Sequence, residues 1–203
     1  MYKQTIEQFT IDLSSNAPIP GGGGVCALVG ALSSSLGSMV ASLTIGKKRY
    51  NDVEEEIKQL NIKSENLRIK LLEDINFDAE SFLPLSKAYS LDKKDPNREQ
   101  ILEKCLVDAS SGPLIILKDI CQVIELLQRY GQIGSKLAIS DIATAAMLAY
   151  GALYGCSINV KANTKLMKNK EFAQERNNQV DKLVEKYGKL AKTIFENINK
   201  EMI

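Results

Sequence analysis

The sequence of 203 residues contains no histidine and no tryptophan. Without histidine, no site that needs an imidazole can form, which excludes Ser-His-Asp triads, Cys-His pairs and HExxH zinc sites. Acid-base chemistry must therefore come from Asp, Glu, Lys, Tyr or Cys side chains.

An excess of charge of either sign is also absent. The 26 Lys and Arg residues balance 25 Asp and Glu residues, which leaves a net charge of +1. Such a chain has no overall basic field with which to gather a nucleic acid, so we expect no nucleic-acid partner.

The four cysteines form no CxxC pair, and the N-terminus has no secretory signal pattern. Most of these cysteines lie in apolar, helix-like stretches, which is typical of small core residues in a reducing compartment. We therefore expect a cytoplasmic protein with free thiols. The cysteines are Cys26, Cys105, Cys121 and Cys156.

Charged residues are missing from two long runs, 13–46 and 142–160. Residues 25–45 are long enough to cross a bilayer, but eight of these 21 residues are Gly, Ser or Thr. Small residues also recur there at steps of three or four, which lets another helix approach closely. We expect a helix buried in a soluble bundle or in an oligomer interface, without a membrane partner, in preference to a transmembrane span. We expect a second fully buried helix in the later run.

Apolar residues recur at helical spacing along most of the chain, and no segment shows sustained alternation. The sequence predicts an all-α fold of roughly six to eight helices in a single domain over residues 1–203. We expect a kink near Pro84, a helix capped by Asp95 with Pro96 in its first position, and a break at Gly112-Pro113. Asp141 stands where the cap of the later uncharged helix belongs. Residues 180–198 carry an apolar seam typical of a surface helix or an oligomer contact.

Four consecutive glycines, Gly21, Gly22, Gly23 and Gly24, precede the first uncharged helix. Glycines permit close backbone approach, and their N–H groups at a helix N-terminus can cradle an anion or a carbonyl oxygen. A tight turn forced by packing explains the same pattern equally well. The motif is neither GxGxxG nor a Walker loop.

Three cations and a phenol follow the same helix: Lys47, Lys48, Arg49 and Tyr50. One cation would complement the negative helix C-terminus, but three together suit a ligand that bears carboxylates. Tyr50 could supply a stacking face or a hydroxyl.

Carboxylates stand at two further places. Asp74 and Asp78 lie one helical turn apart, and such pairs are usually a solvated face. Asp78 is the better candidate, because Phe82 nearby indicates partial burial, which raises the pKa of a carboxyl. Asp141 precedes the second uncharged run, and an inward-facing Asp141 would need a partner such as Lys47 or Lys48, or a cationic substrate.

These segments, in this order, resemble the cyclodeaminase/cyclohydrolase family of tetrahydrofolate enzymes. The motifs of that family correspond to residues 18–28, 43–50, 78–82, 140–145 and 159–163, so the resemblance covers nearly the whole chain. Gly24 stands where the family usually has Ser, and Cys26 where it has Ala.

The resemblance implies a multihelical array around a buried central helix, a homodimer, and a reduced folate as the small-molecule substrate. It implies no metal and no cofactor beyond the folate. Asp141 would be a proton shuttle or cation stabiliser, Asp78 a second carboxylate, and Lys48 or Lys47 would bind the folate tail or tune an Asp. The remaining predicted substrate-binding residues are Gly21, Gly22, Gly23, Gly24, Thr44, Tyr50, Asn159 and Asn163.

Two enzyme activities remain open within this family, and one alternative function is not enzymatic. The chain is expected to add water to methenyltetrahydrofolate or to close formiminotetrahydrofolate with loss of ammonia. Both reactions pass through a tetrahedral carbon between two folate nitrogens. The alternative is a non-catalytic helical scaffold that keeps this fold and binds partners through residues 180–198.

Overall fold

The computed structural model describes residues 1–202 and, over that range, contains seven α-helices and no strand. This confirms the all-α prediction. Two 3-10 turns, Lys48–Val53 and Lys136–Ala138, join neighbouring helices. The helices are α1 (Ile6–Leu13), α2 (Gly22–Thr44), α3 (Glu54–Tyr89), α4 (Arg98–Ala109), α5 (Ser111–Ile133), α6 (Ile139–Leu166) and α7 (Lys170–Glu201).

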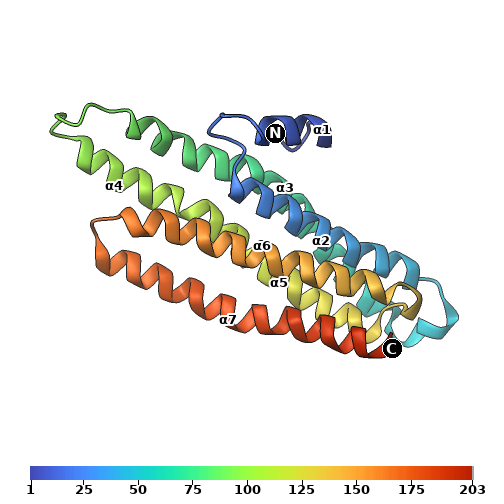
Figure 1. The fold of residues 1–203 in the computed structure, drawn as a ribbon. Coiled ribbons are helices and arrows are strands. Elements are labelled where there is room, and N and C mark those ends of the chain that lie inside the picture. Colours follow the sequence, from blue (N-terminus) through green and yellow to red (C-terminus); the bar gives the residue numbers. More distant parts are fainter. Residues whose placement is uncertain (203) are drawn as a thin grey trace.

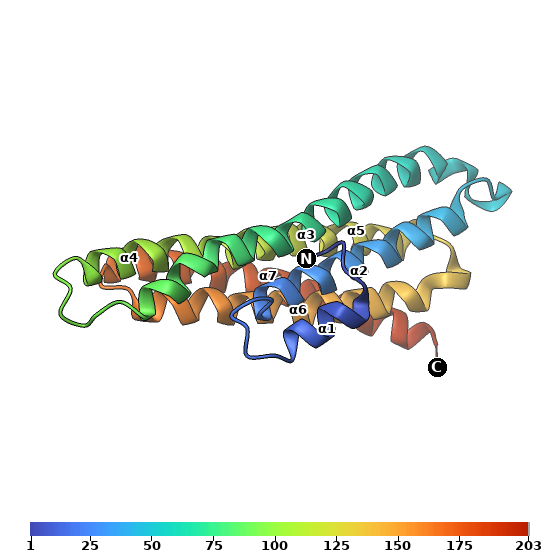
Figure 2. The ribbon, with the colours of Figure 1, turned by 90° about the horizontal axis from the view of Figure 1, so that it is seen from above.

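The long helices run side by side in an elongated bundle (Figure 1). α2 packs against α3, α5 and α6, which makes it the central helix that the resemblance implies. Seen from above, α3, α4 and α5 lie on one side, and α1, α2 and α6 lie on the other (Figure 2). α7 covers α5 and α6.

Small residues on α2 allow close helix packing. A Cβ on Gly30 would come 3.0 Å from the Ile120 side chain, and a Cβ on Gly37 would come 3.0 Å from Tyr130. Buried serines tie α2 to its neighbours: Ser33 donates to the Ala145 carbonyl at 2.7 Å, and Ser34 to the Ser64 carbonyl at 2.8 Å. The serine hydroxyls of α2 thus form hydrogen bonds with acceptors inside the protein, as expected for a core helix.

Two segments are long and apolar enough to cross a membrane, Gly22–Thr44 and Lys136–Leu166. Within the most apolar 18-residue window of each segment, 61% of the first and 50% of the second are buried, as expected for core helices. The prediction that residues 142–160 form a fully buried helix is wrong, because α6 exposes an uncharged strip. That strip consists of Thr144, Met147, Gly151, Tyr154 and Ile158.

The two predicted helix caps differ from the structure, whereas the helix predicted through Pro84 is present as α3 and continues to Tyr89. α4 begins at Arg98 with Asn97 as its cap, and the Asp95 carboxylate accepts the Asn97 backbone N–H at 2.8 Å. Asp141 is the third residue of α6 and not its cap, because the helix extends back to Ile139. The seam of α7 is buried against α5 and α6, which confirms a surface helix.

Candidate functional site

The first turn of α2 meets the middle of α3 at Asp78. A Cβ added to Gly23 would lie 2.3 Å from both carboxylate oxygens, so only a glycine permits this approach. Gly112, at the start of α5, closes on the same carboxyl: its Cβ would lie 3.0 Å from Oδ1 and 3.1 Å from the Asp78 Cα. The Asp78 carboxyl is therefore held between two glycine backbones that come from different helices.

Burial changes the chemistry of this carboxyl. Desolvation raises the pKa of Asp78 to about 6, and the Gly24 backbone N–H partly opposes the rise by donating to the charged form. The prediction that Asp78 is partly buried is confirmed. A carboxyl with this pKa can both accept and release a proton near neutral pH.

The Asp78 carboxyl opens into a cavity of about 220 Å³. Its walls come from the segment before α2, from the middle of α3, from the α4–α5 break and from the last turns of α6. This volume lies below the roughly 300–1,000 Å³ of pockets that enclose a drug-sized ligand, so the cavity would hold only part of one. The lining residues are Pro18, Ile19, Gly21, Gly22, Gly23, Asp78, Phe82, Ala109, Pro113, Asn159, Ala162 and Asn163.

Two asparagines one helical turn apart supply polar groups to this cavity. Asn163 donates its Nδ2 to the carbonyls of Ala109 (3.2 Å) and Asn159 (3.0 Å). The Asn159 amide lies against Gly22, where a Cβ would come within 3.0 Å of Nδ2. Within residues 1–202 no hydrogen bond occupies the Asn159 side chain, so its amide can donate to and accept from a ligand.

A second buried carboxyl lies one turn before Asp78. Asp74 is only 7% exposed, and burial together with the neighbouring Asp119 carboxylate raises the pKa of Asp74 to about 7. Asp119 in turn accepts two bonds of 2.6 Å from the Lys70 ammonium. For Asp74, the solvated-face interpretation is wrong, because α5 covers that side of α3.

The predicted cationic residues lie at the other end of α2. Lys47 and Lys48 are exposed, and within residues 1–202 neither has a carboxylate within 4.0 Å. The Tyr50 hydroxyl accepts the Lys136 backbone N–H at 3.1 Å. Twenty-one residues separate Gly23 from Thr44, about 32 Å along a helix at 1.5 Å per residue.

Two further predicted residues lie at this distant end. Thr44 is fully buried; its hydroxyl donates to the Val40 carbonyl at 2.6 Å and accepts the Ser135 N–H at 2.9 Å. This geometry gives Thr44 a structural role and does not support substrate binding. Asp141 is half-buried and forms no ion pair with Lys47 within the described chain. One chain thus unites Gly21–Gly24, Asp78, Asn159 and Asn163, and leaves Thr44, Lys47, Lys48, Tyr50 and Asp141 apart.

The sequence analysis missed the α4–α5 break as a wall of the cavity. Gly112-Pro113 was interpreted only as a helix boundary, although a Gly next to a Pro also marks a point where backbone can approach closely. The sequence analysis placed the cysteines in the core but missed that Cys26 and Cys156 lie near Asp78. A hydrogen bond from the Cys156 thiol lowers the pKa of Cys26, and burial raises the pKa of Cys156.

Comparisons with known proteins identify the family of the chain. The family model described as formiminotransferase-cyclodeaminase matches residues 5–182. The chain is 36% identical to a methenyltetrahydrofolate cyclohydrolase from Methylorubrum extorquens, over 98% of each protein. It is 26% identical to the formimidoyltransferase-cyclodeaminase of Rattus norvegicus, where the match covers 89% of this chain and only 34% of the rat protein.

A solved structure gives the same result for the fold. The formiminotetrahydrofolate cyclodeaminase of Thermotoga maritima superposes with a TM-score of 0.84 at 28% identity, over 97% of this chain and 98% of that one. The order of the helices, the glycine cradle around Asp78 and these matches together show that the chain belongs to the formiminotransferase-cyclodeaminase family.

Proposed function

We propose that this protein is a tetrahydrofolate one-carbon enzyme that acts at the one-carbon bridge of a reduced folate, as a methenyltetrahydrofolate cyclohydrolase or a formiminotetrahydrofolate cyclodeaminase. The observation that carries the proposal is the Asp78 carboxyl, which faces a small cavity with a pKa raised to about 6. Both reactions need a group that accepts and returns one proton at neutral pH. The full-length match to a cyclohydrolase at 36% identity favours the hydrolytic reaction.

In the hydrolytic direction, Asp78 acts first as a base. The ionised carboxylate takes a proton from water as the water oxygen bonds to the methenyl carbon, which gives a tetrahedral carbon between two nitrogens. The same proton then passes to one of these nitrogens, and the bond between that nitrogen and the carbon breaks. The added hydroxyl loses its proton to the solvent as its oxygen becomes the carbonyl of a formyl group. The overall reaction consumes one water and releases one proton, because the substrate carries a positive charge that the product lacks.

The cyclodeaminase reaction uses the same group in a related order. The amine nitrogen that links the pterin to the benzoyl group bonds to the formimino carbon, and its proton passes to the imino nitrogen. Protonated Asp78 then delivers a second proton to that nitrogen, which departs as ammonia and leaves the methenyl cation. The amide of Asn159 and the free N–H groups of the Gly21–Gly23 turn can bind the polar edge of the pterin.

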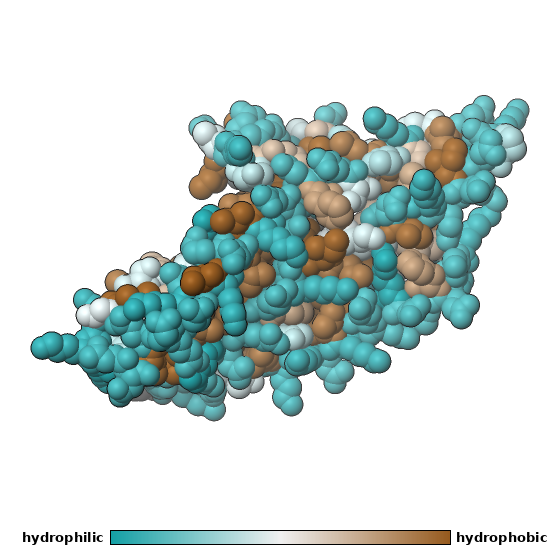
Figure 3. Space-filling view, turned by 180° about the vertical axis from the view of Figure 1, so that it is seen from behind, coloured by the Kyte–Doolittle hydropathy of each residue, from teal (hydrophilic) through white to brown (hydrophobic). Residues whose placement is uncertain are grey.

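We also propose that the working form is a homodimer in which a second copy covers the uncharged faces of α2 and α6. α2 and α6 lie side by side (Figure 1), and the exposed side chains along both are uncharged apart from Lys165 in the last turn of α6. The opposite face of the molecule is mainly hydrophilic, with scattered apolar patches (Figure 3). An uncharged face of this extent is typical of an oligomer contact. Its exposed large side chains are Leu32, Met39, Leu43, Met147, Tyr154 and Ile158.

A two-fold partner with antiparallel helices would place its Lys47, Lys48 and Asp141 near the Asp78 cavity of the first copy. This arrangement would supply the rest of the binding surface, since the cavity alone holds only part of a folate. It would also bring together the two groups of predicted residues that one chain keeps about 32 Å apart.

A spectrophotometric assay tests the proposed activity. Purified protein is mixed with methenyltetrahydrofolate, and loss of the methenyl chromophore is followed against the spontaneous rate. A parallel reaction starts from formiminotetrahydrofolate and follows the appearance of the chromophore together with ammonia. Silence in both, with folded protein that binds no folate, would contradict the proposal and favour the scaffold alternative.

Mixing two defective variants tests whether the site is shared between copies. One variant carries Asp78→Asn, and the other carries Lys47→Met with Lys48→Met. In a shared site, a mixed dimer has one site with both lesions and one intact site. An equimolar mixture assayed at low salt, with substrate well below KM so that the lysine variant is defective, should therefore recover about a quarter of the wild-type activity. No recovery after exchange of subunits, verified by mass measurement of mixed dimers, would show that each copy is complete or that the copies do not pair this way.

A further inference from the structure

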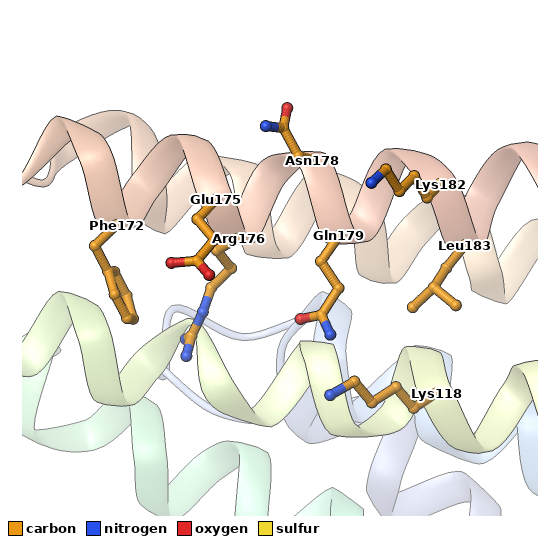
Figure 4. A pocket seen from close by; sticks show the side chains of 8 residues that line it. All are labelled: Lys118, Phe172, Glu175, Arg176, Asn178, Gln179, Lys182 and Leu183. Atoms are coloured by element: carbon orange, nitrogen blue, oxygen red, sulfur yellow. The ribbon is translucent and has the colours of Figure 1, made fainter.

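Arg176 of α7 crosses the groove between α5 and α7 (Figure 4). This groove has a volume of about 860 Å³ and is lined by both helices. The Arg176 guanidinium points toward α5 and lies 4.7 Å from the ring centre of Phe172. Within residues 1–202 it forms no ion pair, and burial lowers the pKa of Arg176. A half-buried cation without a carboxylate is costly, so its other contacts must account for its place.

Those contacts all fall on the break between α4 and α5. Nη1 of Arg176 donates to the Val107 carbonyl at 3.2 Å, to the Ser111 hydroxyl at 3.1 Å and also to the Ser110 hydroxyl. Ser110 is fully buried. From the other side, Asn163 donates to the Ala109 carbonyl at 3.2 Å. The break is thus held between α6 and α7.

The next residue after this break is Gly112, which covers Asp78. A Cβ added to Gly112 would lie 3.0 Å from Oδ1 and 3.1 Å from the Cα of Asp78. The backbone of the first turn of α5 is therefore in close contact with Asp78. If the break loosened, the backbone at Gly112 would move off the carboxyl and water would take its place. The contacts therefore run without a gap from Arg176 through Ser110 and Ser111 to Gly112 and Asp78.

We propose that Arg176 is a positioning residue for Asp78: it fixes the α4–α5 break so that Gly112 covers the carboxyl and keeps water from it. This inference rests on the proposed function, in which Asp78 carries the proton. A structural role limited to docking α7 would leave the environment of Asp78 unchanged, and that difference can be measured.

Other titratable groups near Asp78 are known and can be followed separately. They are Cys26 on α2, Cys156 on α6 and Asp74 one turn away on α3. The first turn of α5 carries no charged side chain, and Asp108 at the end of α4 is exposed. Arg176 itself contributes no direct charge effect to the pKa of Asp78, whose shift comes from burial. An effect of replacing Arg176 must therefore pass through the backbone at Gly112.

The test replaces Arg176 with Met, which keeps the length and the packing against Phe172 but removes every donor. Two measurements are made: the pKa of Asp78, from the pH titration of its carboxyl ¹³C resonance assigned with Asp78→Asn, and the pH profile of kcat. Lys182→Met is the matched control, because Lys182 lines the same groove and forms no hydrogen bond or ion pair within residues 1–202.

We expect Arg176→Met to lower the pKa of Asp78 by about one unit, because water returns to the carboxyl. We expect kcat to fall about tenfold with a less than twofold change in KM, and the acid limb of the kcat profile to move with the carboxyl. Arg176→Lys should lie between Arg176→Met and the wild type, and Lys182→Met should match the wild type in both measurements.

Folded Arg176→Met protein with the wild-type Asp78 titration would overturn the proposal, whatever its activity. If Arg176→Met does not fold, Ser110→Ala removes one acceptor while it keeps the arginine, and a wild-type Asp78 titration in that variant would have the same force. A shifted Asp78 titration in a protein whose wild type is inactive on both folates would uphold the positioning role while it removes the proposed function.

Discussion

The two ends of α2 use the same helix in opposite ways. At its first turn, glycine backbone lies against the partly buried carboxyl of Asp78, from which the protein has removed water. Beyond the last turn of α2, the long and exposed side chains of Lys47, Lys48 and Arg49 carry three positive charges. The first environment raises the pKa of Asp78, because the protein removes water from the charged form of the carboxyl.

The second environment suits a different task. Exposed cations attract an anionic ligand over several ångströms. The comparison indicates that chemistry belongs to the glycine end and affinity to the cationic end. Four substitutions test that division, beginning with the one for which we expect the largest effect.

Replacing Asp78 with Asn should lower kcat by about a thousandfold or more, because the amide has the same shape but carries no transferable proton. Folate binding should change by less than about threefold. Steady-state kinetics and direct titration of the folate measure the two effects. A variant that keeps a tenth of the wild-type kcat would move the proton transfer to another group, and Asp141 would be the next candidate.

Gly23→Ala should lower activity by about a hundredfold, because its Cβ would lie 2.3 Å from both Asp78 oxygens and would push the carboxyl out of its cradle. The matched substitution is Gly21→Ala, where nothing lies within 4 Å of the new Cβ. Circular dichroism and thermal unfolding check both folds. Equal losses in the two variants would show that helix entry, and not the contact with Asp78, explains the glycines.

The substitution Asp74→Asn tests whether burial controls the pKa of a carboxyl near the first turn of α2. Folded Asp74 keeps its proton up to pH of about 7, whereas an unfolded Asp loses it near 4, so stability should fall as the pH rises through that window. The Asn variant escapes this loss. Its free energy of unfolding at pH 8 should exceed that of the wild type by about 2 kcal/mol.

The pH dependence of that difference is the sharper measurement. The two proteins should converge below about pH 4, where Asp74 is protonated in both the folded and the unfolded state. Glu73→Gln, at the exposed neighbouring position, should change stability by less than about 0.5 kcal/mol at either pH. Urea unfolding at pH 4 and pH 8 provides the comparison, and a constant difference would contradict the assigned cause.

Lys47→Met together with Lys48→Met should have the smallest effect, a fall in kcat/KM of about tenfold at low salt that comes mainly from KM. The deficit should shrink as ionic strength rises, because salt weakens the wild-type attraction. Lys93→Met with Lys94→Met is the control: it removes an adjacent exposed pair in the α3–α4 loop. A change in kcat without a change in KM would place one of the two lysines at the chemistry.

Much of the fold follows from local sequence patterns. Residues such as Ile57, Leu71 and Ile75 repeat at helical steps and are buried where the period places them. The glycine motif and Asp78 were identifiable because their chemistry depends on residue type: four glycines before a helix, and an acid beside apolar residues.

What the sequence did not predict depends on partners distant in the chain. Asp74 and Asp78 have similar neighbours, and only the packing of α5 buries Asp74 beside Asp119. Similarly, nothing local to Thr44 shows that its hydroxyl is taken by Ser135. The exposed strip on α6 has the same Ala-rich and Gly-rich composition as a core helix, so composition could not distinguish a buried face from one left for a partner.

The unbroken length of α2 sets a fixed spacing in the molecule. It spans 23 residues without a proline and with no charged side chain, so it acts as a rod of about 34 Å between the acid and the cations. In a two-fold pair, the length of α2 would therefore set the distance between the reacting carbon and the site that holds the anionic tail. Loss of a single turn would shorten that reach by about 5 Å while leaving each end intact.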